Sequence, residues 1–285
     1  MDTRHFSKAN ALKYIFIYFL LFLAGDLLSS LLFDLLFSAV ELPVRQLYPI
    51  LRMSGCLLLT YLLFWLYTAK GLRMRMEDFG ITCSVQKWGI LLAVLLPLFV
   101  VSVYLLIGDT AVNAVPFGEA LLIAAASLAI GAKSGILEEM LFRGYMMRLL
   151  ESGWNRRFAI LVPSVVFGLL HIPSMDTFSI AGVLLLTLSG TLVGIMFSIA
   201  AYRGNSIGNS ALLHGVWNAV MITDLLHITT AQDAYGSPLV SITIPSDSIF
   251  LTGGGFGAEA SVVSIAGYLL VCGFILFMSR KNPAE

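Results

Sequence analysis

The chain has 285 residues, of which 58% are hydrophobic and 12% are charged, and its formal net charge at neutral pH is zero. A soluble globular domain has about one quarter charged residues, so this composition excludes an ordinary soluble domain and indicates a polytopic membrane protein. The zero net charge and the lack of basic runs outside short loops give no sign of a nucleic-acid partner. The three cysteines are far apart and fit no metal-binding or redox spacing: Cys56, Cys83 and Cys272.

Long apolar segments dominate the chain. A helix of about 20 residues crosses the hydrocarbon core of a bilayer, and eight segments reach about that length. The N-terminal one lacks a convincing cleavage site and is interpreted as a retained helix. The predicted helices cover residues 12–40, 47–68, 88–107, 117–150, 156–174, 178–201, 206–227 and 261–279. No repeat or composition break divides the chain, so we expect a single membrane domain, residues 1–285, that is an all-α bundle of about eight transmembrane helices.

Positive charge is unevenly distributed between the two ends of these helices. Loops 108–116, 174–177 and 228–260 contain no lysine or arginine, whereas most of these residues lie in the loops and tails at the other end, and only Arg45 breaks the rule. Cytoplasmic loops retain lysine and arginine, so we expect an integral membrane protein, in the plasma membrane, with both termini cytoplasmic. The longest loop, 228–260, contains an alternating stretch, LVSITI, but we interpret it as a connection without regular structure.

The fourth predicted helix contains the stretch GILEEMLFRGYMMRLL, which starts at Gly135 and includes four charged residues. A charge in the middle of a membrane helix costs roughly 2.5 to 3.5 kcal/mol on insertion scales, so such residues persist where they have a partner or a function. Glu139 and Arg143 are four residues apart and can pair on one helix face. Glu138 is rotated about 100° around the helix from Glu139. Its neighbours three and four residues before it are small, and no cation lies three or four residues after it. A buried carboxyl group without a counter-ion suits a general base or acid.

Polar residues also interrupt the fifth and seventh predicted helices. The sequence FGLLH places Phe167 and His171 one turn apart, and HGVWN does the same for His214 and Asn218. At a rise of about 1.5 Å per residue, both histidines and Glu138 lie at depths at which their side chains can meet. We therefore expect one buried polar cavity between the three helices. The alternative for each histidine alone is a hydrogen bond between helices, and Phe167 is as well explained by packing.

These residues resemble a known pattern of three motifs. EExxxR, FxxxH and HxxxN occur in this order on separate membrane helices, as EEMLFR from Glu138, FGLLH and HGVWN. The pattern is similar to that of the CPBP family of intramembrane proteases, which includes the type II CAAX prenyl endopeptidases and the bacteriocin-processing, Abi-like proteins. The resemblance covers residues 117–227, which would form the catalytic core, and implies an eight-helix fold.

The resemblance also implies a role for each motif residue. Glu138 and His171 would activate a water molecule that attacks a peptide carbonyl, and His214 and Asn218 would donate hydrogen bonds to the oxyanion. Glu139 and Arg143 would hold the helix in position, and Phe167 would shape the pocket. The substrate would be a prenylated, CAAX-type peptide or another membrane-associated peptide or protein, reached through a cavity that faces the cytoplasm.

Three alternatives accompany this interpretation. Glu138, His171 and His214 could form a His2Glu zinc site, although the chain lacks the HExxH helix of many zinc proteases, so we expect a metal-free, glutamic-type endopeptidase. A proton-coupled membrane carrier would also use intramembrane Glu and His, but no inverted repeat or pair of broken helices supports it. A non-catalytic membrane scaffold is the third alternative, against which the complete set of motif residues argues.

Overall fold

The structure, a computed structural model, describes residues 6–40, 42, 44–230 and 236–281. Helices account for most of it, which confirms the all-α membrane bundle. The long helices are α1 (Lys8–Ala39), α2 (Leu47–Leu66), α3 (Lys87–Ile107), α4 (Phe117–Glu139), α6 (Arg156–Leu170), α7 (Ile180–Gly204), α8 (Gly208–Met221) and α10 (Val262–Lys281). Two short helices, α5 (Met147–Gly153) and α9 (Ile249–Thr252), complete the set within these residues.

Seven helical segments of the described chain are long and apolar enough to cross a membrane. They correspond to seven of the eight predicted spans. The exception is the predicted span 206–227, where α8 has only 14 residues and ends at Met221. At a rise of about 1.5 Å per residue this helix is about 21 Å long, shorter than a bilayer core of about 30 Å. It ends early because a turn begins at Ile222 and a strand follows, so α8 lies within the bundle as a short helix.

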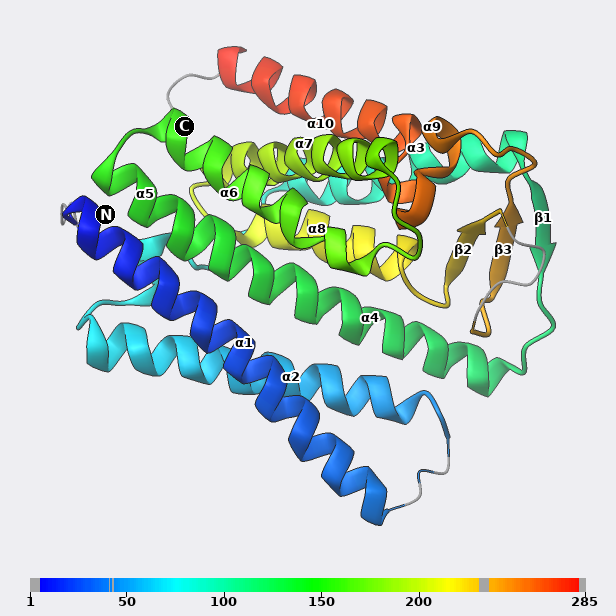
Figure 1. Ribbon diagram of the computed structural model, residues 1–285, viewed down its shortest axis with the longest axis horizontal. Coiled ribbons are helices and arrows are strands. Elements are labelled where there is room, and N and C mark those ends of the chain that lie inside the picture. The colour runs from blue at the N-terminus through cyan, green and yellow to red at the C-terminus, as the bar shows by residue number, and fades with distance from the viewer. Residues whose placement is uncertain (1–5, 41, 43, 231–235, 282–285) are drawn as a thin grey trace.

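Helix α4 forms the spine of the molecule (Figure 1). It continues through a π-helix, Met140–Met146, into α5, and packs against α8 on one side and α2 on another. Helices α6 and α7 pack together, and α10 packs against α7 and α3. Figure 1 shows both termini at one end of the bundle and all three strands at the opposite end. The two ends of the molecule are therefore structurally distinct.

The strands correct one prediction from the sequence. The loop 228–260, expected to lack regular structure, contains part of β2 (Leu226–Thr229) and all of β3 (Val240–Thr243). The sheet order is β1-β3-β2, where β1 (Asp109–Val112) pairs antiparallel to β3 and β2 pairs parallel to it. The alternating stretch therefore forms the central strand of a small sheet, whose other two strands come from separate parts of the chain.

Small residues allow the helices around the motifs to approach closely. A Cβ atom on Gly190 of α7 would lie 2.5 Å from the Cα of Gly168 in α6, and one on Gly194 would lie 2.8 Å from Ser164. A Cβ on Gly135 of α4 would lie 2.6 Å from the carbonyl oxygen of Ala211 in α8. Real Cβ contacts are longer than these distances. The absence of a side chain at these glycines therefore allows α6 to pack closely against α7, and α4 against α8.

Candidate active site

A fully buried ion pair lies at the centre of the motif region. The Nη1 atom of Arg143 donates a hydrogen bond of 2.7 Å to Oε1 of Glu139, and neither side chain is exposed. Arg143 also donates through Nη2 to the carbonyl of Gly194 in α7, at 3.0 Å, and its guanidinium lies 4.9 Å from the ring centre of Phe167. The pair predicted from the i,i+4 spacing is thus present, and it ties α4 and its π-helix to α6 and α7.

The same carboxylate orients a histidine, which the spacing alone did not indicate. Oε1 of Glu139 lies 3.1 Å from Nδ1 of His214, so it contacts both the guanidinium of Arg143 and this imidazole. His214 is 3% exposed and its ring stacks on Phe197 at 4.8 Å between centres. Because a carboxylate accepts hydrogen bonds, Nδ1 is the donor and Nε2 is left to face other groups. Glu139 is therefore a positioning residue for His214 as well as a partner of Arg143.

Glu138 approaches His214 from the other side of the ring. Its Oε2 lies 3.8 Å from Nε2 of His214, and its side chain is 19% exposed. His214 is thus placed between two carboxylates, one at each ring nitrogen. Glu138 differs from its neighbour, as predicted, in having no lysine or arginine partner among the described residues. No hydrogen bond or ion pair joins Glu138 to His171 within the described chain. Glu138 contacts His214, and His214 lines the same cavity as His171.

His171 stands at the C-terminal end of α6. Pro173 has no N–H with which to continue the hydrogen bonds of the helix, so α6 ends at Leu170 with His171 as its C-cap, and a 3-10 turn, Ile172–Ser174, follows. Its Nδ1 lies 2.7 Å from the carbonyl oxygen of Phe167. A carbonyl can only accept, so the proton is on Nδ1 and Nε2 of the neutral ring carries a lone pair. This tautomer leaves His171 ready to accept a proton.

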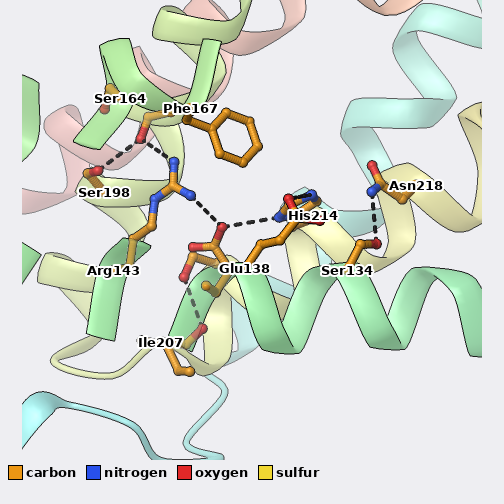
Figure 2. Close-up of polar contacts among 12 residues, drawn as sticks. Ser134, Glu138, Arg143, Ser164, Phe167, Ser198, Ile207, His214 and Asn218 are labelled. Carbon is orange, nitrogen blue, oxygen red and sulfur yellow. Dashed lines mark hydrogen bonds and ion pairs between the residues drawn. The ribbon is translucent and has the colours of Figure 1, made fainter. Parts of the chain in front are cut away.

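Asn218 is fixed by a hydrogen bond to α4. Its Nδ2 donates to Oγ of Ser134 at 2.8 Å (Figure 2), and the hydroxyl of Ser134 donates in turn to the carbonyl of Ile130 at 3.0 Å. This chain of bonds uses one of the two amide protons of Asn218. The second proton is available to another acceptor.

A cavity of about 330 Å³ brings most of these residues together. His171, His214 and Asn218 line it, together with Phe167, whose ring lies 4.6 Å from that of His171 and 5.7 Å from that of His214. Glu138 does not line this cavity, but it lies beside His214, which does. A polar cavity is therefore present and Phe167 forms part of its wall, but no residue of α4 lines it, so the expectation that Glu138 would open into it is not met.

Comparison with known families now identifies the motif region. Residues 119–220 match the family described as type II CAAX prenyl endopeptidase Rce1-like. The match covers about a third of the chain, and over this segment the chain is similar to the type II CAAX prenyl endopeptidases. The matched segment contains every motif residue from Glu138 to Asn218, so the similarity supports a peptidase of this kind. A search of curated proteins finds no match to this chain.

The cavity of this CAAX-type protease contains a further carboxyl group that the motifs do not include. Glu259 lines it and accepts a hydrogen bond of 2.8 Å from Nε1 of Trp217 in α8. Its own backbone carbonyl accepts bonds from Tyr268 and Ser189, both at 3.0 Å. Burial raises the pKa of Glu259 from 4.5 to about 7, although the hydrogen bond from Trp217 and the nearby His214 both act to lower it. Its position in a long loop gave no periodicity from which the sequence could have predicted it.

The walls of the protease cavity differ from expectation in one respect. Ile228, Phe256 and Glu259 line it, and all three lie in segment 228–260, which follows α8 at the strand-bearing end. The sequence placed that segment on the side opposite the termini. The cavity is therefore walled by the end of the bundle that carries the sheet, whereas a cavity facing the cytoplasmic end was expected.

The described residues of the protease contain no group of three or more His, Cys, Asp or Glu side chains that could hold a metal ion. Glu138, His171 and His214, the set considered for zinc, do not form such a group. In both histidines Nδ1 already has a hydrogen-bond partner. It is the carboxylate of Glu139 for His214 and the backbone carbonyl of Phe167 for His171.

Proposed function

We propose that the protein hydrolyses peptide bonds of membrane-associated peptides with a water molecule activated by Glu138 and His171. The observation that carries this proposal is the tautomer of His171. Its Nδ1 proton is held by the carbonyl of Phe167, and its basic Nε2 belongs to the cavity that His214 and Asn218 also line. A neutral imidazole with a free lone pair that faces a cavity is what general-base activation of water requires, and Glu138, which lies beside His214, would assist it.

His214 and Asn218 would stabilise the tetrahedral intermediate. Asn218 has one amide proton left after its bond to Ser134. Nδ1 of His214 is held by Glu139, so an Nε2–H on the opposite side of the ring would donate the other hydrogen bond to the oxyanion. Glu139 and Arg143 would act as positioning residues, because they fix the orientation of His214 without reaching the cavity.

The reaction would need no metal. The proposed steps use only the water, two carboxylates, two imidazoles and an amide, so a chelator such as 1,10-phenanthroline should leave turnover unchanged. Loss of activity with the chelator, followed by recovery on addition of zinc, would instead support a metalloprotease.

The substrate would be a prenylated, CAAX-type peptide or another peptide anchored at the bilayer. The decisive experiment incubates the purified protein in detergent with matched peptides, farnesylated or unmodified, and compares it with Glu138→Ala and His171→Ala. Each variant should lose about 10² to 10⁴ in kcat. The control is Glu151→Ala, a carboxylate of α5 that pairs with Arg148 outside the cavity. If the two site variants cleave as fast as the control, the proposed mechanism is wrong.

We also propose that the protein lies in the plasma membrane with both termini in the cytoplasm. The support is the distribution of lysine and arginine, which are missing from loops 108–116, 174–177 and 228–260. Two C-terminal fusions would test this orientation. One carries a fluorescent protein that fluoresces only in the cytoplasm, and the other carries a phosphatase that is active only after export. A bright fluorescent fusion and an inactive phosphatase fusion are expected, and the reverse pair would contradict the orientation.

A further inference from the structure

A second, polar cavity adjoins the catalytic one at the strand-bearing end. It has a volume of about 380 Å³ and shares with the first cavity the residues Met221, Ile228, Phe256 and Gly257. The ring of Phe256 stands between them, 5.9 Å from the ring of His171 in a T-shaped contact. A chain that occupies the second cavity can therefore continue past Phe256 to the catalytic residues.

The edge of strand β2 forms one wall of this second cavity. Four successive residues, His227, Ile228, Thr229 and Thr230, line it. Successive side chains of a strand point to opposite faces of the sheet, so one face could not present all four. The cavity consequently lies along the edge of β2, where the backbone itself is the surface.

That edge is unpaired on the side of the cavity. The sheet order β1-β3-β2 places β2 at one margin of the sheet. The nitrogen of Ile244 donates to the carbonyl of Thr229 at 2.7 Å, so in this parallel register Thr229 and His227 direct their backbone groups toward β3. Ile228, between them, directs its N–H and C=O away from β3. Within the described chain, no backbone hydrogen bond reaches Ile228 from outside the sheet.

We infer that the free edge of β2 binds the peptide substrate in an extended conformation, with Ile228 as its hydrogen-bonding residue, and leads the scissile bond past Phe256 to His171. This inference rests on the proposed function. Addition of a strand to an exposed sheet edge is a general mode of peptide recognition, in which backbone bonds supply affinity and side-chain pockets supply specificity.

The lining of the second cavity indicates which peptides fit. Asp176 and Asp247 contribute carboxylates, and hydroxyl groups come from Thr177, Ser179, Thr229, Thr230 and Thr252. No lysine or arginine lines it. A polar segment with a basic side chain therefore complements this cavity better than an acidic or wholly apolar one.

The test measures binding separately from cleavage. Fluorescein-labelled decapeptides with one lysine, farnesylated or unmodified, are titrated by anisotropy against the full-length Glu138→Ala protein in detergent. Each peptide is also prepared with a single backbone N-methyl group at successive positions. N-methylation should weaken binding by about fivefold at the one residue whose N–H donates to the carbonyl of Ile228, the loss expected for one hydrogen bond, and by less than about twofold at its neighbours.

Two variants of the protein complete the test. Ile228→Pro removes the N–H that faces the cavity but no bond to β3, a position at which an edge strand accepts proline, and it should weaken binding by about the same factor. Ile228→Val keeps the N–H and should bind as wild type does. If no position of the methyl scan weakens binding, or if no decapeptide binds, the inference is wrong even when Ile228→Pro fails to fold. Equal cleavage by wild type and Glu138→Ala would instead refute the catalytic proposal and leave the binding result to stand by itself.

Discussion

Replacement of Arg143 by methionine would leave the carboxylate of Glu139 buried without its counter-ion. Both side chains are 0% exposed, and their bond is 2.7 Å long. Removal of one member of a buried pair typically costs about 3 to 5 kcal/mol, because the remaining charge is uncompensated. For a chain of this size about 1 kcal/mol corresponds to about 2 to 4 °C in Tm, so a fall of roughly 6 to 20 °C is expected.

The double variant Glu139→Gln/Arg143→Met separates this charge effect from simple loss of packing. Glutamine keeps an oxygen that accepts from Nδ1 of His214, and methionine replaces part of the volume of the arginine side chain. The double variant should therefore be more stable than either single one, with a coupling energy of at least about 2 kcal/mol in the thermodynamic cycle. Thermal unfolding in detergent, followed by size-exclusion chromatography of a fluorescent fusion, measures all four proteins. A double variant that is no more stable than Arg143→Met would refute the argument.

Three further predictions concern other parts of the structure. Burial raises the pKa of Glu259 from 4.5 to about 7, so its contribution to stability is present below about pH 4.5 and is lost as the pH rises through about 7. Tm should fall over this interval by the equivalent of at most about 3 kcal/mol, and Glu259→Gln should remove that dependence. Asn218→Ala should lower kcat about 10²- to 10³-fold with little change in KM, and an unchanged kcat would count against its oxyanion role. Gly135→Val should separate α4 from α8 and lower Tm, whereas Gly273→Val, at a position where a Cβ meets no atom within 4 Å, should not.

The membrane bundle could be predicted from the sequence because length and hydropathy decide which segments span a bilayer. The one exception, α8, shows the limit of that reasoning. Its sequence is apolar enough to continue, but Leu226 enters a sheet whose other strands come from distant parts of the chain. Hydropathy measures composition along a window and carries no information on such long-range pairing.

Those parts of the candidate site that depend on residue spacing within one helix could be predicted from the sequence. The i,i+4 spacing gave the pair Glu139 and Arg143, and helix depth gave the cavity that His171 and His214 share, but it wrongly included Glu138 in its lining. The contact between Glu139 and His214 was not predictable, because helix rotation depends on which side chains pack between helices. Glu259 could not be found either, since a loop residue has no periodicity from which its direction can be derived.

The catalytic cavity borders the sheet, while both termini lie at the opposite end of the bundle (Figure 1). The cavity opening and the chain ends are thus separated by the length of the bundle. A fusion or affinity tag at either terminus would therefore leave the approach of the substrate unobstructed.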